Sequence, residues 1–547
     1  MNTNHFAQGP DWKWLTTCGL MLVVGLSASL SSAADQPAAA LFDEAAFRTV
    51  FAFDQVSIPH TQNLRLEMRA PAKHPANPVV PRGGPGTPDS WAVQFYGSVI
   101  REGGKFRMWY VAAGDERTEG KEPRSAPWRA AYAESHDGVT WIKPNLGLVE
   151  YRGNKNNNLI LTDPAPLGIL NLKVLADPDE PNPERRYKIS THVWFPKGKS
   201  RFGTLAPFAS ADGLRWKMLT DARPVAAELA QEDLVLPAIH FEPCGGLYKW
   251  EGMYYASGQN ASIATRPYHG RVVRMVHSPD FVQWSHTSAI GFVRAAQHTL
   301  LGAGRSREGE QTHEGISVWN RGNVLLGVYG IWHGAKEWKD VTIDLGFVVS
   351  NDGLNFREPA HEWTFLERGE DGAWDQGGLL QGQGFENVGD QTFIYYGAWD
   401  PRHWEGSPPR GGVGIATLPR DRFGDLVVEE AAKGPGDYQL PVIQSEFITA
   451  AVPSKAHTAH RFYLNAAGLG AAAALKIELL GEKEQPLPGY SGGDAAVVRQ
   501  SGFQTPIAWD GKKEAHQLPE RIRIRVTFEG ERKSDIRFSA LYVQAGS

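Results

Sequence analysis

Two glutamates, Glu242 and Glu314, have the sequence setting that best suits acid–base chemistry. Glu242 ends the run H-F-E at 240–242, and Glu314 ends Q-T-H-E at 311–314; both precede glycines and an apolar stretch typical of a strand. Paired carboxyls can act as acid and base because a partly dry site raises the pKa of one and leaves the other ionised. A structural alternative is that each glutamate only caps backbone amides or pairs with an arginine.

Further polar and aromatic residues occupy equivalent places before or after predicted strands. No compact metal-binding spacing such as H-E-x-x-H occurs, so we expect the histidines to hydrogen-bond hydroxyl groups. The tryptophans suit either stacking on sugar rings or packing between structural units. The candidates before strands are Asp89, Gln94, Asn171, His240, His313, Asp375 and Gln383, and those after strands are His192, Trp194, Trp332, His333, Trp399, Asp400, His403 and Trp404.

A turn followed by an aromatic residue repeats along the chain and indicates how these residues are positioned. It reads S-H-D-G-V-T-W at 135–141, and five copies follow one another at spacings of 75, 68, 72 and 69 residues. Aspartate and glycine suit such turns because Asp bonds the nearby backbone and Gly tolerates positive φ. The turn aspartates, which we interpret as structural, are Asp137, Asp212, Asp280, Asp352 and, in a degenerate copy, Asp421.

Each repeat of about 70 residues has room for four strands. Apolar and aromatic runs precede the turns and predict the second strand of each unit; they lie at 106–110, 187–190, 253–256, 324–329 and 393–397. Five four-stranded units in series predict a five-bladed β-propeller. The alternative, an α/β barrel, requires amphipathic helices between strands, and the sequence shows no convincing one.

The fold class expected is therefore all-β, a five-bladed propeller followed by a small β-sandwich. Beyond about residue 435 the repeat stops, and 522–529 alternates apolar and polar residues as in a strand with one wet face. The predicted domains are a signal peptide at 1–34, a proline-rich wrapping segment at 35–90, the propeller at 91–434 and the sandwich at 435–547.

Propeller geometry predicts which face binds a ligand. The loops before first strands and after second strands open on one face and are long here, whereas the Asp-Gly turns on the other face are tight. Glu242 and Glu314 fall on the long-loop face near the central axis. Asp177, in the eye-catching pair Asp177-Pro178, falls in a hairpin on the opposite face, so we interpret it as a turn residue.

Composition and charge exclude several classes of protein. The chain is 41% hydrophobic and 21% charged, as in ordinary globular proteins, and its net charge of −5 without a long basic run argues against nucleic acid as a partner. Lys13 and the apolar stretch 15–26, followed by small residues, predict an export signal cleaved after Ala33 or Ala34. Removing Cys18 with the signal leaves Cys244 alone, so no disulfide forms within the mature chain.

The sequence resembles the five-bladed propeller glycoside hydrolases of the invertase-like and arabinanase-like kind, some of which carry a C-terminal β-sandwich. The resemblance rests on M-W-Y at 108–110, E-S-H-D-G-V-T-W at 134–141, W-x-K-P-N-L-G at 141–147 and F-E-P-C-G-G-L-Y at 241–248, which is similar to the invertase-type segment of the acid glutamate. The W-x-N-D-P-N-G motif of invertases is absent, and the first two repeats lack aspartates at their strand heads.

Two functional hypotheses follow. The first is a secreted or periplasmic glycoside hydrolase acting on a poly- or oligosaccharide, with Glu242 as general acid and Glu314 or Asp89 as base or nucleophile. The second is a propeller that binds a glycan without cleaving it, which the missing aspartates favour. We expect a carbohydrate partner, no membrane association after signal removal and no cofactor, with a structural calcium left open. The glycan, the stereochemistry of cleavage and the oligomeric state stay open.

Overall fold

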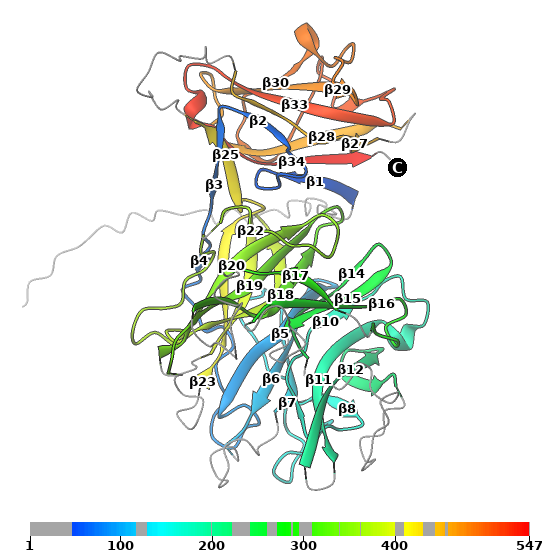
Figure 1. The fold of residues 1–547 in the computed structure, drawn as a ribbon, viewed down its shortest axis with the longest axis vertical. Coiled ribbons are helices and arrows are strands. Elements are labelled where there is room, and N and C mark those ends of the chain that lie inside the picture. Colours follow the sequence, from blue (N-terminus) through cyan, green and yellow to red (C-terminus); the bar gives the residue numbers. More distant parts are fainter. Residues whose placement is uncertain are drawn as a thin grey trace, which may run out of the picture. The chain divides into compact units, whose positions relative to one another are not determined.

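The computed structural model describes residues 46–115, 128–197, 200–220, 241–259, 271–285, 288–294, 309–337, 340–361, 363–399, 410–429, 444–454 and 458–545. These residues form strands and turns with three short 3₁₀ helices, Pro183–Arg185, Gly492–Asp494 and Lys533–Asp535, and none of them lies in an α-helix (Figure 1). The predicted all-β class is confirmed. Residues 1–45, with the predicted export signal, lie outside this description.

The repeat region folds into five units of mainly antiparallel strands, blades one to five, each of which begins with an inner strand. Blade one contains β5 (Ala92–Glu102), β6 (Lys105–Ala113) and β7 (Arg129–Ser135). Blade two contains β10 (Val174–Ala176), β11 (Tyr187–Lys197), β12 (Ser200–Ser210) and β13 (Arg215–Met218), joined by β8 (Leu161–Asp163) and β9 (Gly168–Ile169).

The remaining three blades continue this order along the chain. Blade three contains β14 (Glu242–Trp250), β15 (Met253–Gln259), β16 (Val273–Ser278) and β17 (Ala289–Phe292). Blade four contains β18 (Gly309–Asn320), β19 (Leu325–Gly334) and β20 (Thr342–Ser350). Blade five contains β21 (Leu379–Val388), β22 (Gln391–Ala398), β24 (Val413–Pro419) and β4 (Ala72–Lys73), while β23 (Arg410–Gly411) pairs with β5.

The inner strands close into a ring. β5, β10, β14, β18 and β21 contact one another in that order, and β21 returns to β5, with Gln383 opposite Ser98. The strands between them are buried almost throughout, as in β19 and β20, because neighbouring blades cover both of their faces. This ring makes the molecule a propeller, as the repeat spacing predicts.

The last blade is completed by the N-terminal part of the chain. β4 pairs antiparallel with β24, with Lys73 opposite Ala416, so a segment before blade one becomes the outer strand of blade five. Pairing of the two ends in one blade protects an edge that would otherwise stay open.

The turn aspartates support the blades as predicted. Oδ1 of Asp137 accepts the backbone N–H groups of Val139 and Thr140 at 2.8 and 2.7 Å, and the same two bonds form at Asp212, Asp280 and Asp352. These hydrogen bonds lower the pKa of Asp137 to about 2 although partial burial opposes the shift. The aspartate carboxylates therefore stabilise the turn conformation.

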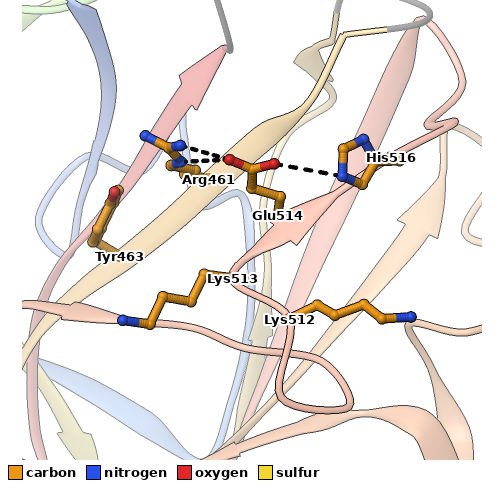
Figure 2. Close-up of a pocket in the computed structure, with 6 residues that line it drawn as sticks. All are labelled: Arg461, Tyr463, Lys512, Lys513, Glu514 and His516. Carbon is orange, nitrogen blue, oxygen red and sulfur yellow. Dashed lines mark hydrogen bonds and ion pairs between the residues drawn. The ribbon is translucent and has the colours of Figure 1, made fainter.

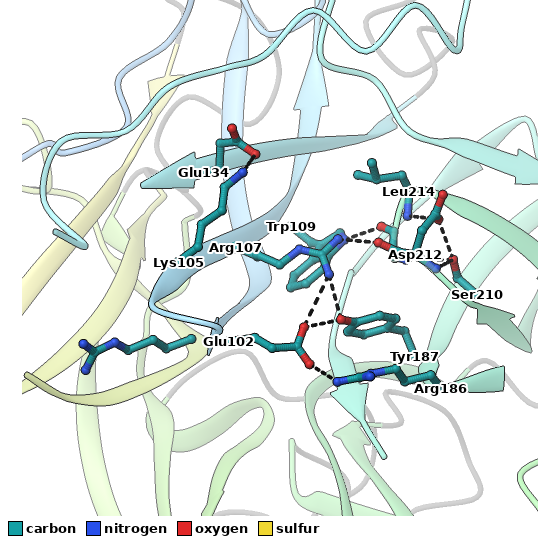
Figure 3. A network of polar contacts seen from close by, with 12 residues as sticks. Glu102, Lys105, Arg107, Trp109, Glu134, Arg186, Tyr187, Ser210, Asp212 and Leu214 are labelled. Atoms are coloured by element: carbon teal, nitrogen blue, oxygen red, sulfur yellow. Dashed lines mark hydrogen bonds and ion pairs between the residues drawn. The ribbon is translucent and has the colours of Figure 1, made fainter. Parts of the chain in front are cut away.

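Blades one and two are joined by a polar network around Arg107 (Figure 3). Arg107 donates from Nη1 to Tyr187 Oη at 2.8 Å and from Nη2 to the carbonyl of Asp212. Trp109 Nε1 donates to the carbonyl of Gly213 at 2.7 Å, and Glu102 accepts from Tyr187 and Arg186. The turn of blade two is therefore docked on the second strand of blade one.

A two-layered β-sandwich accompanies the propeller and uses strands from both ends of the described chain. One sheet contains β1 (Phe47–Phe51), β3 (Leu64–Met68), β25 (Gly424–Val428), β28 (His460–Ala467), β31 (Gly502–Pro506), β32 (Glu514–Ala515) and β34 (Arg537–Ala545). The other contains β2 (His60–Gln62), β26 (Glu446–Ile448), β27 (Val452–Pro453), β29 (Ala474–Gly481), β30 (Ala496–Val498) and β33 (Arg521–Glu529).

The N-terminal segment differs from a simple wrapping segment. β1 pairs with β34, β2 with β26, and β3 with β25, so residues 47–68 are part of the sandwich. β25 also enters the sandwich before the boundary expected at 435. Short strands among prolines and turns give a weak periodic signal, and their partners lie hundreds of residues away in the sequence.

A buried ion pair links the last blades to the sandwich. Arg321 Nη1 and Nη2 contact the Asp421 carboxylate at 2.6 and 3.1 Å, and Tyr542 Oη of β34 donates to the same carboxylate at 2.9 Å. Asp421 is fully buried and has a φ of +60°. Unlike the other turn aspartates, this degenerate copy therefore joins two domains.

Candidate functional site

Four of the five inner strands carry the same irregularity. Relative to their partners, β5, β14, β18 and β21 each contain two extra residues, located between Gln94 and Ser98, Glu242 and Gly246, His313 and Ile316, and Gln381 and Phe385. Such β-bulges redirect side chains and often lie near functional sites. In β18 the bulge contains Glu314, whose φ is +60°, and Gly315, where an added Cβ would lie 2.7 Å from Gly258 N.

Glu242 and Glu314 meet at a single amide. Gln259 Nε2 donates to Glu242 Oε2 at 2.8 Å and to Glu314 Oε1 at 2.5 Å. The two acceptor oxygens are therefore at most 5.3 Å apart, the sum of these distances. Gln259 lies opposite Glu242 in the pairing of β14 and β15, so the sheet register brings this amide to the glutamates.

The orientation of the Gln259 amide follows from its other contacts. Its Oε1 accepts from Arg271 Nη1 at 2.8 Å and from the backbone N–H of Glu314 at 3.1 Å. Because both of these groups are donors, the carbonyl must face them and the NH₂ must face the carboxyls. Arg271 also lies 3.8 Å from Glu314 Oε1 and stacks over the ring of Trp332 at 4.3 Å.

The two glutamates differ in how deeply they are buried, and burial affects the pKa of a carboxyl group. Burial, together with the charge of Glu242, raises the pKa of Glu314 well above its ordinary value, and Arg271 only partly opposes the shift. Two carboxyls this close do not both ionise easily. Of the two carboxyls, the buried Glu314 is therefore the one that more readily keeps a proton, whereas Glu242 is partly exposed.

Cys244 is unsuited to nucleophilic chemistry. It is fully buried, and burial together with the neighbouring carboxyl groups of Glu314 and Glu242 raises the pKa of its thiol well above the ordinary value. The thiolate is the reactive form of cysteine, so the protonated Cys244 contributes packing.

His313 forms part of an aromatic stack beside Glu314. Its ring lies between Trp332, at 5.2 Å and 19°, and Trp399, at 5.7 Å and 17°. Tyr96 Oη lies 3.4 Å from His313 Nδ1. Burial, and then the charge of Arg271, lower the pKa of His313 well below its ordinary value, so the ring is neutral.

Blade two contributes buried polar residues that tie strands together. The Asn171 amide donates to the carbonyls of Ser190 and Pro243 at 3.1 and 2.9 Å, and its Oδ1 accepts from the backbone N–H of His192 at 3.0 Å. His192 itself is fully buried against the ring of Trp194. Lys173 Nζ, also fully buried, donates to Ser317 Oγ at 3.1 Å and to the Gln381 carbonyl at 2.7 Å.

Asp89 and Asp375 are held in matching contacts away from the glutamate pair. Asp89 Oδ2 accepts from Lys143 Nζ at 2.6 Å and from Tyr110 Oη at 2.8 Å. Asp375 Oδ2 accepts from Lys73 Nζ at 2.6 Å and from Tyr396 Oη at 3.1 Å. In both cases the lysine lies at the outer edge of the blade and the tyrosine on its second strand, and we call each set a blade clamp.

Blade four repeats the blade clamp with the charges exchanged. Arg294 Nη1 donates to Tyr329 Oη at 2.8 Å and pairs with Glu358, which also accepts from Tyr329. The cation here precedes the blade and the carboxylate follows its last strand. This recurrence in three blades indicates a structural role for the clamp aspartates.

The other predicted residues have separate positions. Gln94 lies on β5 just before the bulge, and His333 at the end of β19 bonds Asp344 Oδ2 through Nε2 at 2.8 Å. Asp177, in the hairpin between β10 and β11, pairs with Lys188 and Lys249 at 3.1 and 3.0 Å. His240 and Asp400 lie outside the described residues.

The structure adds Gln259, Arg271 and Tyr96 to the site. Gln259 ends a strand that the sequence predicts, and pairing that strand with the one at Glu242 would have pointed to it. Arg271 and Tyr96 give no comparable signal. Within the described ranges, no group of three or more His, Cys, Asp or Glu side chains is arranged to hold a metal ion, and no helix there is long and apolar enough to cross a membrane.

Comparisons with known proteins give structural neighbours only. No family model and no curated protein matches the sequence. A solved structure of a putative glycosidase from Bacteroides thetaiotaomicron is 15% identical, with 63% of this chain and 96% of that chain covered and a TM-score of 0.39. An N-acetylgalactosamine deacetylase from F. plautii, solved with blood group B trisaccharide, is 15% identical over 66% of this chain and 96% of that chain, with a TM-score of 0.39.

A further solved structure carries a description of the GH130 family of mannoside phosphorylases and of glycoside hydrolases that target β-1,2 mannosidic linkages in Candida mannan. It is 15% identical, covers 67% of this chain and 96% of its own, and has a TM-score of 0.37. TM-scores of this size add nothing to what the sheet topology shows directly.

Proposed function

We propose that the chain is a glycoside hydrolase whose reaction is carried out by Glu314 and Glu242 at the propeller axis. The observation that carries this proposal is the sharing of the Gln259 amide by one buried and one partly exposed carboxyl. Glu314 donates its proton to the glycosidic oxygen, and Glu242 stabilises or attacks the sugar carbon left behind. The acid in this proposal is Glu314 and not Glu242, the residue expected from the sequence, because Glu314 is the more deeply buried of the two.

The spacing favours a retaining reaction. Retaining glycosidases hold their two carboxyl groups about 5 to 5.5 Å apart, and inverting enzymes about 6.5 to 9.5 Å, to leave room for a water molecule. The two carboxyl oxygens that accept from Gln259, Glu242 Oε2 and Glu314 Oε1, lie within 5.3 Å of each other. Glu242 would then form the bond to the sugar, and Glu314 would afterwards take a proton from the incoming water.

The test is a panel of poly- and oligosaccharides assayed for new reducing ends, with three variants. Glu314→Gln and Glu242→Gln should each lower turnover by roughly 10²- to 10⁴-fold, the usual contribution of a positioned acid or base. Glu251→Gln, at the other end of the same β14–β15 hairpin, is the matched control and should keep full activity. Equal activity in all three variants would exclude the pair.

The pH profile provides a second readout. Because Glu314 must be protonated, the rate should fall as pH rises through its raised pKa. Glu314→Gln should abolish this alkaline limb in whatever activity remains. Fresh product analysed by NMR should keep the anomeric configuration of the substrate, and inversion would contradict the role given to Glu242.

Binding without cleavage is the second candidate function. It is favoured by the blade clamps, since Asp89 and Asp375 are each paired with a lysine and do not join Glu242 and Glu314. A glycan that binds the native chain with no reducing ends released, and binds Glu314→Gln equally well, would support this alternative.

A further inference from the structure

The C-terminal sandwich has an open pocket of its own. It has a volume of about 510 Å³ and lies against β28, β32 and the hairpin that precedes β32 (Figure 2). It shares no residue with the glutamate site. Its lining consists of Arg461, Tyr463, Lys512, Lys513, Glu514 and His516.

A tight hairpin presents the two lysines. Trp509 and Lys512 exchange both backbone hydrogen bonds, at 3.0 and 2.9 Å, around Asp510 and Gly511, whose φ values are +49° and +73°. Positive φ at both central residues is the geometry of a two-residue type I′ turn, which Asp-Gly favours. Trp509 is buried and packs edge-on against Phe462 at 5.4 Å, so the base of the hairpin is anchored in the sandwich core.

The charges in the pocket are unequal. Arg461 and Glu514 lie opposite each other on β28 and β32, and Glu514 Oε1 accepts from Arg461 Nε and Nη2 at 3.0 and 2.6 Å. The negative charge of Glu514 is therefore already balanced by Arg461. Among the described residues, the exposed Lys512 and Lys513 ammonium groups have no hydrogen bond or ion pair, so the pocket carries a surplus of two positive charges on a chain whose net charge is −5.

We propose that this pocket binds an anionic glycan, with Lys512 and Lys513 contacting carboxylate or sulfate groups and Tyr463 offering its ring to a sugar face. Figure 2 shows Lys513 extending to the side of Tyr463 and Lys512 extending the other way. This arrangement suits a glycan that carries negative charges on different sugar units. A half-buried tyrosine ring beside cations fits an acidic sugar, because sugars present an apolar face and polar edges. The pocket would hold the glycan without cleaving it.

The experiment measures binding of the full chain to polygalacturonate, dextran sulfate and neutral dextran by isothermal titration calorimetry at low and moderate salt. Lys512→Gln/Lys513→Gln should weaken binding of at least one anionic polymer roughly tenfold or more, about 1.4 kcal/mol. The matched control Lys483→Gln/Lys217→Gln removes the same charge from exposed sites outside the pocket and should leave affinity within about twofold.

The arms of the test separate its outcomes. Binding of polygalacturonate alone would identify carboxylate as the recognised group, and binding of dextran sulfate alone would identify sulfate. An equal loss in the pocket and control variants would overturn the proposal, since net charge would then explain binding. Tighter binding of a DNA oligonucleotide than of any glycan, or equal binding of neutral dextran, would also overturn it. Glu314→Gln should leave this affinity unchanged. A failure of the proposed hydrolysis can therefore be told apart from a failure of glycan binding in the pocket.

Discussion

At the scale of single residues, Lys173 places an ammonium group where water does not reach. Burial lowers its pKa to about 7, and the residue still donates to Ser317 Oγ and to the carbonyl of Gln381. These bonds connect blade two with blades four and five through the centre of the ring. Lys173 therefore ties the propeller together, yet it is costly to protonate in the folded state.

This cost predicts how stability depends on pH. Between pH about 7 and 10.5 the unfolded chain holds a proton that folded Lys173 has lost, so stability rises with pH across that window and is lower at pH 7 and below. The largest possible effect is about 5 kcal/mol, from 1.36 kcal/mol per pKa unit. Lys173→Met should flatten this rise in thermal melts recorded from pH 6 to 10. An unchanged slope would show that the lysine titrates normally.

The two central glutamates could be predicted from sequence because each occupies the head of a strand in a regular repeat. Their bridging partner, Gln259, could not be chosen in the same way, since its role depends on which residue the register of β14 and β15 sets opposite Glu242. The sequence leads us to expect Glu242 as the acid, whereas the proposal above gives that role to Glu314. The role of acid depends on how deeply the bulge in β18 buries Glu314. This burial arises only when the five blades have closed into a ring, so the local sequence does not show it.

At the scale of elements, the blade clamps explain why aspartates before inner strands need not be catalytic. Asp89 and Asp375 resemble Glu242 in sequence position, and only the structure shows that a lysine at the outer edge of the blade reaches each of them. Lys143 follows the turn of blade one, whereas Lys73 comes from β4, at the other end of the propeller sequence. No local pattern connects Lys73 with Asp375.

We predict that variants of the clamp aspartates lose stability but keep their catalytic activity. Asp89→Asn and Asp375→Asn should each lower the free energy of unfolding by roughly 1 to 3 kcal/mol, because a lysine loses its charged partner in a partly buried site. Activity per folded molecule should not change. Asp371→Asn, exposed in the same loop as Asp375, is the control for denaturant titration. A large fall in rate at unchanged stability would instead place Asp89 in the reaction, as the sequence allowed.

At the scale of the whole molecule, the contact of Arg321, Asp421 and Tyr542 connects propeller and sandwich. Removing one member of a buried ion pair leaves the other charge uncompensated, which typically costs about 3 to 5 kcal/mol. Arg321→Met should therefore destabilise the protein by that order in denaturant titrations. Arg461→Met, which breaks an exposed pair in the sandwich, should cost much less. Similar losses in both variants would contradict the importance of the junction.

The export prediction is tested on secreted material. Mass spectrometry should find an N-terminus near Ala34 or Asp35 and one thiol per chain, since Cys18 is removed with the signal. That thiol belongs to the buried Cys244 and should react with thiol reagents only after denaturation. An intact Met1 would contradict cleavage, and rapid labelling of the native protein would contradict the buried position.

The pairing of the N-terminal strands has a consequence for biosynthesis. β1 pairs with β34 and β4 with β24, so each of these early strands must find a partner that is made several hundred residues later. At roughly 5 to 20 residues per second, several hundred intervening residues mean a delay of tens of seconds. During this time each domain lacks one of its paired strands. The propeller can close once β24 has been made, whereas the sandwich must wait for β34.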